Sequence, residues 1–351
     1  MKNRYKNTYY SKYNIMTSST SISQYIENVL DVNHALTEDI KEIHDTDAIT
    51  ITFGDQAENH AGMQKIGKMQ DSGFSIEDLQ NISKLMGEKG LDRELIELNN
   101  FLPEECRDNT ENAAVLIIRG LLNSFSMSAD KLFHELKTVK WDTFLVSTRT
   151  NEIQRKHARA NICIANIKDI PNYTKTDYDL HVNSNYWQDE NLSMLYKKQQ
   201  DLRKETGERV KLSKQEIQSN KGTIVKWETL SVLAQFKKYI EGNFGEHANN
   251  LVAEGNSYVS LKTCYIGPHG DTERKIVIAI RLGKSFPMYF HWYHKSKPIG
   301  ELITLPILNH GDVYIMSEKA VGKDWKSSSK ITLRHSAGFV ANTLFMKNKL
   351  F

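Results

Sequence analysis

The 351-residue chain is poor in cysteine and has no long apolar segment. Its three cysteines, Cys106, Cys163 and Cys264, lie far apart and form no Cys-x-x-Cys pair. This spacing indicates neither a disulfide framework nor a thiolate zinc site, and a reducing compartment is the simpler interpretation. Because no apolar run reaches about 18 residues, no membrane-spanning segment is predicted. We expect an intracellular protein, cytoplasmic or nuclear.

The chain also lacks a strong net charge and a secretory signal. The formal charge is +3, from 46 basic and 43 acidic residues, which is compatible with nucleic-acid binding but does not indicate it. Segment 1–21 has basic residues with no apolar stretch after them, unlike a secretory signal. Its polar composition predicts a disordered leader. Nothing in the sequence indicates an oligomeric state.

Hydrophobic residues make up 39% of the chain, enough for a sizeable core. Alternating helical and strand patterns predict an α+β N-terminal region over 22–160. The β-branched alternation of AITITFGD predicts a strand that ends at Gly54. Ser75 and Asp78 form a capping-box pattern at the start of a predicted helix over 75–90. Further helices are predicted at 21–30, 128–137 and 229–242, and 113–122 fits a strand or a helix.

Residues 190–220 are highly charged and predict an exposed insertion. Basic side chains there can contact phosphates. Interleaved acidic residues, however, favour a solvated charged face. The basic residues are Lys197, Lys198, Arg203, Lys204, Arg209, Lys211 and Lys214.

After Gly245 the sequence consists of short strand-like runs separated by Gly, Pro and Asn. Strands at a spacing of roughly ten residues predict a β-sandwich or barrel rather than a parallel sheet. We therefore expect a mainly β protein, with a β domain over 161–351 on which the N-terminal region packs.

A polar cluster at 269–274 stands directly before the apolar run 276–280. Residues two apart on a strand share a face, so His269 and Asp271 would present an imidazole beside a carboxylate. The His-x-Asp pattern alone fits a solvated turn equally well. His335 ends a later strand-like run, and two histidines with one carboxylate suit non-haem Fe(II), which keeps three octahedral positions open.

Other histidines compete for the third ligand position. His310 precedes a Gly-Asp turn and is the best alternative to His335. His291 and His294 have a spacing that a strand would place on opposite faces, and His60 is expected in a loop.

The segment GNSYVSLKTCYIGPHGDTER, residues 255–274, resembles the AlkB-like branch of the Fe(II)/2-oxoglutarate-dependent dioxygenases. That branch has an Asn-x-Tyr strand followed by a His-x-Asp turn with acidic residues, matched here by Asn256, Tyr258, His269 and Asp271. The later HGDVYIMS and ITLRHSAG resemble the family's Gly-Asp strand and distal metal histidine, which favours His335 over His310. The resemblance is specific over 251–338. It is looser over 49–67, which is similar to relatives encoded by algae and large DNA viruses.

The resemblance implies a double-stranded β-helix, or jelly roll, as the catalytic core. It implies that His269, Asp271 and His335 hold Fe(II), that Asn256 and Tyr258 bind the cosubstrate 2-oxoglutarate, and that dioxygen takes the remaining position. The expected reaction is hydroxylation of a C–H bond, which on an N-methyl group leads to demethylation.

A modified nucleic-acid base is the preferred substrate. The alternatives are a protein or small-molecule hydroxylase and a non-catalytic jelly-roll binding module. A flipped base needs stacking partners. The candidates are Tyr186, Trp187, Trp292 and Tyr293, although aromatic residues at such positions more often belong to the core.

One feature departs from the family pattern. The family has arginines shortly after the distal histidine that bind the 2-oxoglutarate carboxylate, whereas no arginine follows His335. Arg281 lies an even number of residues after Asp271, which gives it the same face of a regular strand. Lys347 is nearer the family's usual position. A guanidinium binds carboxylates in bidentate geometry, so Arg281 is the preferred anchor.

Overall fold

The computed structural model describes the chain in segments that all belong to one compact unit, Asp45–Phe351. The described residues are 48–59, 64–108, 110–139, 141–143, 160–166, 169, 224–258, 261 and 264–339. Several predictions fall outside them: the leader 1–21, the helix at 21–30, the charged insertion 190–220, His60, Tyr186, Trp187 and Lys347.

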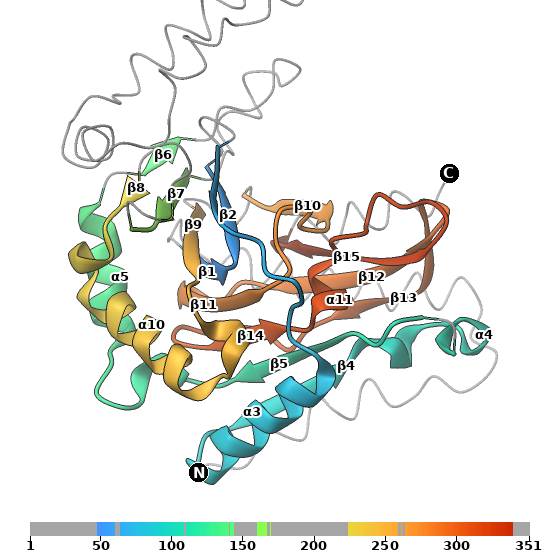
Figure 1. Ribbon diagram of the computed structural model, residues 1–351, viewed down its shortest axis with the longest axis horizontal. Helices are drawn as coiled ribbons and strands as arrows, with labels where there is room; N and C mark the ends of the chain where they lie inside the picture. Colours follow the sequence, from blue (N-terminus) through green and yellow to red (C-terminus); the bar gives the residue numbers. More distant parts are fainter. Residues whose placement is uncertain are drawn as a thin grey trace, which may run out of the picture. The chain divides into compact units, whose positions relative to one another are not determined.

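Three β-sheets form the framework of the described chain (Figure 1). The larger sheet has the strand order β4-β5-β14-β11-β1-β9-β7-β6, with β8 beside β7. Its strands are β4 (Arg93–Glu97), β5 (Ala114–Ile118), β14 (Val313–Met316), β11 (Val277–Gly283), β1 (Ala48–Gly54), β9 (Val252–Tyr258), β7 (Ala160–Ile164), β6 (Asp142–Thr143) and β8 (Ile224–Val225). The pairings are antiparallel apart from β7 with β8.

A smaller sheet has the order β10-β15-β12-β13, and β2 and β3 form a separate hairpin. The strands are β10 (Ile266–His269), β15 (Ile331–Ala337), β12 (Met288–His294), β13 (Lys297–Thr304), β2 (Gln56–Asn59) and β3 (Gln64–Gly67). The prediction of a mainly β protein is therefore confirmed.

Three helices cover one face of the larger sheet: α3 (Ile76–Glu88), α5 (Ala129–Thr138) and α10 (Ser231–Asn243). The predicted capping box starts α3, because Ser75 Oγ accepts from Asp78 N and Asp78 Oδ2 accepts from Ser75 N. Shorter elements are α4 (Glu104–Arg107), α11 (Glu318–Val321), η1 (Leu98–Phe101), η2 (Leu121–Asn123), η4 (Trp227–Thr229) and η5 (Glu246–Ala248). No helix of the described segments is long and apolar enough to cross a membrane.

Strand alternation sends the side chains of the larger sheet into two cores. On β11, Ile278 and Ile280 pack toward the helices, whereas Val277 and Ala279 pack toward the smaller sheet. Both faces of the strand are buried, which explains its continuous apolar run. Arg281 is the next residue on the face of β11 that is directed toward the smaller sheet, and it is a charged residue at the end of the apolar run.

Strand β1 lies in the centre of the larger sheet, between β11 and β9. Strands β4 and β5 extend the same sheet beyond β14. The sheet therefore does not divide at the predicted boundary near residue 160, because strands from both sides of that residue pair directly. The open assignment at 113–122 is also resolved: 114–118 form β5, and Gly120 then turns the chain with φ 58° into η2.

Candidate metal centre

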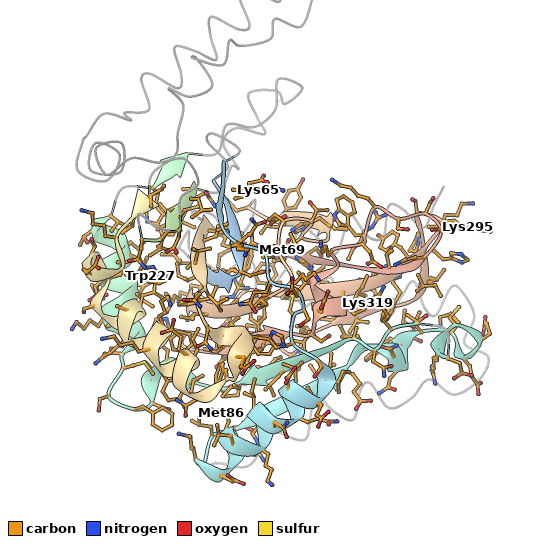
Figure 2. The ribbon with its side chains drawn as sticks, viewed as in Figure 1. Lys65, Met69, Met86, Trp227, Lys295 and Lys319 are labelled. Atoms are coloured by element: carbon orange, nitrogen blue, oxygen red, sulfur yellow. The ribbon has the colours of Figure 1, made fainter. Side chains whose placement is uncertain are left out.

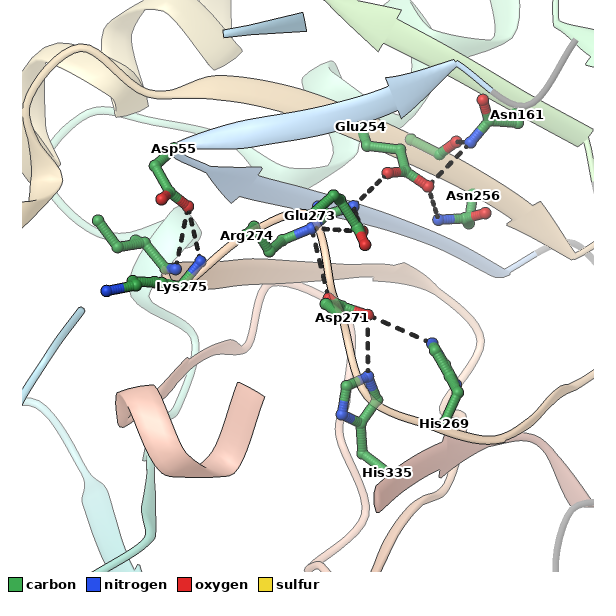
Figure 3. A network of polar contacts seen from close by, with 12 residues as sticks. Asp55, Asn161, Glu254, Asn256, His269, Asp271, Glu273, Arg274, Lys275 and His335 are labelled. Carbon is green, nitrogen blue, oxygen red and sulfur yellow. Dashed lines mark hydrogen bonds and ion pairs between the residues drawn. The ribbon is translucent and has the colours of Figure 1, made fainter. Parts of the chain in front are cut away.

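His269, Asp271 and His335 converge on one point (Figure 3). The Nε2 atoms of His269 and His335 lie 3.4 Å and 3.5 Å from the same oxygen, Asp271 Oδ1. The three ligand atoms all lie within 4.8 Å of one another. The structure thus brings together the triad that the sequence predicted.

Strand pairing and a tight turn create this convergence. His269, the last residue of β10, lies directly opposite His335 on β15. Asp271 lies beyond the strand end, and its backbone N–H donates to Val321 O at 3.0 Å. The carboxylate is therefore placed by a turn packed on α11, and not by the strand alternation from which its position was predicted.

Gly270 makes this turn possible. A Cβ atom at this position would lie 2.1 Å from Gly322 O and 2.8 Å from Trp325 Cδ1. The contact with backbone leaves no room for a side chain, so the His-Gly-Asp turn packs against the end of α11 only because the middle residue is glycine.

Both imidazoles are suited to bind a metal through Nε2. His269 Nδ1 lies 2.7 Å from Gly267 O, which assigns the proton to Nδ1 and leaves the Nε2 lone pair free. Burial, and secondly the neighbouring His269, lower the pKa of His335 below its usual value. His335 is therefore a neutral imidazole near pH 7, the form that binds metals.

Arg274 sets the charge of the site. Its Nε lies 3.4 Å from Asp271 Oδ2, and its Nη2 lies 2.6 Å from Glu254 Oε2 and 2.8 Å from Glu273 Oε1. Burial alone would raise the pKa of Asp271, but the positive charge of Arg274, and secondly the neighbouring His335, hold it well below its usual range.

The donor set fits a divalent cation. Asp271, Glu254 and Glu273 face the single positive charge of Arg274, so this partly buried group carries an excess of two negative charges. Excess buried charge of one sign is costly unless a counterion neutralises it. Two imidazole nitrogens and one carboxylate oxygen suit Fe(II) with open coordination positions.

A cavity of about 460 Å³ extends from the triad between the two sheets. Its wall includes Asn256 and Tyr258 of β9, Thr50 of β1 and Arg281 of β11. Arg281 is 1% exposed, and its Nη1 donates to Thr50 Oγ1 at 2.7 Å. Among the described residues it forms no ion pair with a carboxylate, although the charge of Asp312 acts on it, and its Nε has no hydrogen-bond acceptor. A buried guanidinium facing a cavity in this state suits an anionic ligand.

Comparison with known proteins places the chain in a family. It is 37% identical over 297 residues to "Uncharacterized protein R156" of Acanthamoeba polyphaga mimivirus. The alignment covers 85% of this chain and 97% of the mimivirus protein. The chain belongs to the same family as this mimivirus protein. No protein-family model and no solved structure matches it.

The other histidines lie away from the triad. His310 Nδ1 accepts from the backbone N–H of Gly283 at 2.8 Å, and its Nε2 lies 3.2 Å from Asp130 Oδ1. His291 is buried on β12 and His294 ends that strand, and neither joins the metal-ligand group.

Two of the stacking candidates, Trp292 and Tyr293, are core residues, as aromatic residues at such positions more often are. Trp292 is fully buried in the core between the sheets, where its Nε1 donates to Leu98 O at 2.9 Å. Tyr293 is 3% exposed and lies beneath the Arg334 guanidinium, 3.9 Å from the ring centroid. Neither ring has a free face for a ligand.

Two residues of the site that lie outside the polar cluster 269–274 had no predicted role. Glu254 links Arg274 to Asn256, whose Nδ2 donates to Glu254 Oε1 at 3.2 Å. Thr50 supports Arg281 from β1. The alternation Glu254-x-Asn256-x-Tyr258 places Glu254 on the cavity face of β9, and this pattern could have drawn attention to it.

Proposed function

We propose that the protein is an Fe(II)/2-oxoglutarate-dependent dioxygenase of the AlkB-like branch, with a double-stranded β-helix as its catalytic core. The observation that carries the proposal is one cavity with two complementary ends. At one end, His269, Asp271 and His335 offer two imidazoles and a carboxylate. At the other, Arg281 offers a buried cation without a carboxylate partner among the described residues. The two facing antiparallel sheets support the β-helix assignment.

In this proposal His269, Asp271 and His335 would hold Fe(II). Bound iron supplies the redox chemistry that couples decarboxylation of 2-oxoglutarate by dioxygen to hydroxylation of a substrate C–H bond. Of the two oxygen atoms of dioxygen, one enters succinate and the other enters the substrate. On an N-methyl group the product N–CH2OH breaks its C–N bond and releases formaldehyde.

Arg281 would bind the distal carboxylate of 2-oxoglutarate. Thr50 holds the guanidinium in place by accepting a hydrogen bond from Nη1, and burial of the pair strengthens a charge-assisted contact. Tyr258 and Asn256 line the cavity and would contact the same ligand. The family resemblance lacks its usual arginine after His335, and Arg281 would supply the missing charge.

A group of unpaired cations supports a nucleic-acid substrate. Lys295 and Lys297 flank the β12–β13 turn, and Lys323, Lys326 and Lys330 follow α11. All are exposed, and none forms an ion pair within the described segments. Figure 2 shows Lys295 at the tip of this hairpin. Exposed lysines without an ion-pair partner suit the phosphate backbone of a nucleic acid.

One of these lysines, Lys326, is linked to the candidate metal centre through Trp325. Its ring packs against the Gly270 turn, Lys326 Nζ lies 5.3 Å from its centroid, and the Arg334 guanidinium lies 5.1 Å from it. A modified nucleic-acid base is therefore the preferred substrate. A protein or small-molecule hydroxylase is the alternative, and a non-catalytic jelly-roll binding module is the third reading.

Succinate release tests the proposal. Protein loaded with Fe(II) is supplied with 2-oxoglutarate and dioxygen, and methylated oligonucleotides and methylated peptides are compared for stimulation. We expect turnover that methylated oligonucleotides stimulate and that Asp271→Ala abolishes. Wild-type turnover in Asp271→Ala would overturn the triad. Stimulation by peptides alone would favour the protein-hydroxylase alternative.

A further inference from the structure

The two oxygen atoms of Asp271 have different surroundings. Oδ1 faces the Nε2 atoms of both histidines, at 3.4 Å and 3.5 Å, whereas Oδ2 faces Arg274 Nε at 3.4 Å (Figure 3). A free carboxylate can bind a metal through one oxygen or through both. At this site the second oxygen already has a cationic partner.

Arg274 is itself held in place. It is 4% exposed, and Glu254 Oε2 and Glu273 Oε1 hold its Nη2 at 2.6 Å and 2.8 Å. The other oxygen of Glu254 accepts from Asn161 Nδ2 at 3.1 Å and from Asn256 Nδ2 at 3.2 Å. The contacts form a buried chain from β7 through β9 to the metal turn.

Charge neutralisation does not account for this arrangement. Arg274 alone would balance Asp271, yet Glu254 and Glu273 also contact the guanidinium and restore the negative excess. What the two glutamates add is a fixed position. Glu254 Oε2 accepts from Nη2, and Glu273 Oε1 accepts from both Nη2 and Nε, so the guanidinium is held as an ion-pair partner 3.4 Å from Asp271 Oδ2.

We propose that Arg274 is a positioning residue that keeps Asp271 Oδ2 off the metal, so that the carboxylate binds a divalent ion through Oδ1 alone. With the two histidines this leaves about three of six coordination positions open. The need for three positions, for a chelating cosubstrate and dioxygen, rests on the proposed function. The ligation mode of Asp271 does not.

Mn(II) gives a readout without turnover. The number of exchangeable waters on bound Mn(II) is measured from the broadening of its electron paramagnetic resonance lines in oxygen-17-labelled water, with the full-length protein. We expect about three waters in the wild type and about one fewer in Arg274→Met, which removes the charge at similar length. The freed Oδ2 would occupy the lost position.

Two further variants sharpen the experiment. Lys275→Met removes the neighbouring cation, which contacts Glu318 at 3.3 Å and not Asp271, and should keep the wild-type water count. Glu254→Gln keeps its shape but weakens the hold on Arg274, and should lower the count as Arg274→Met does. The test uses each of Arg274→Met and Glu254→Gln that folds. If such a variant keeps the wild-type number of waters on Mn(II), the proposal is overturned. An equal loss in Lys275→Met would overturn it as well.

The outcomes separate this inference from the proposed function. One result is that wild-type protein binds Mn(II) with about three waters and yet never releases succinate. That result would be compatible with the role of Arg274 and would contradict the dioxygenase proposal. Wild-type protein that binds no Mn(II) at all removes both.

Discussion

His269 and His335 are directly paired across β10 and β15, with ring centroids 4.5 Å apart. Two strands that are distant in sequence thus carry two nitrogen ligands to one position, and Asp271 adds the oxygen from the adjoining turn. The site depends on this pairing register, and the first prediction tests it.

His335→Ala should lose Mn(II) binding and turnover, because it removes one of three ligands and the affinity of such sites depends on ligand count. His310→Ala is the matched control, since His310 contacts Gly283 and Asp130 and not the triad. Calorimetric titration with Mn(II) measures the difference. The reverse pattern would move the third ligand to His310.

Arg281→Ala should raise the apparent KM for 2-oxoglutarate by well over tenfold while Mn(II) still binds. Loss of a buried charged partner costs roughly 2–5 kcal/mol of binding. Thr50→Val removes only the hydroxyl that holds the guanidinium and should give a smaller rise. An unchanged KM in Arg281→Ala would exclude it as the anchor. The remaining candidate, Lys347, would then be tested by Lys347→Ala.

Gly270→Ala should weaken Mn(II) binding by tenfold or more, because the added Cβ would force the turn away from Gly322 and Trp325. Gly267→Ala, on the same β10 segment, is the control, since its Cβ would meet nothing within 4 Å. Mn(II) affinity and thermal unfolding of both variants are compared. Equal affinities would show that the turn tolerates a side chain.

The charge-reversal variant Lys326→Glu/Lys330→Glu should bind a single-stranded oligonucleotide more weakly. Its affinity should also depend less on salt, because binding releases fewer counterions when phosphate contacts are lost. Lys131→Glu on α5 is an exposed single control. Fluorescence anisotropy at several salt concentrations measures both effects. An equal loss of oligonucleotide affinity in the control would show that the weaker binding comes from the change in net charge alone.

Local patterns predicted much of the fold. The capping box located α3, and the β-branched alternation located β1, because these signals lie within one element. The position of β1 in the centre of the sheet was not predicted. That position depends on its pairing with β11 and β9, whose residues lie far away in sequence.

The candidate site shows the same division. The triad was predicted from short motifs and the family resemblance. Arg281 was predicted from its even separation from Asp271 on a regular strand. The structure has a turn at 271–276, and only 277–283 form β11. Of the two alternatives for Trp292, base stacking and the core, the structure shows the core. On β12 it shares one face with Met288 and Phe290, and all three side chains belong to the core between the sheets. The role of Glu254 needed the tertiary contact with Arg274.

The central place of β1 makes the folding of the cavity depend on the early part of the chain. Thr50 and Arg281 meet across 231 positions of sequence, and such long-range pairing is slow to form. Until β1 inserts, β9 and β11 each present an open strand edge, which invites pairing between molecules. A fragment that starts after residue 160 would keep all three metal ligands in its sequence. It would lack the strand that closes the sheet beneath them, and we expect it to aggregate.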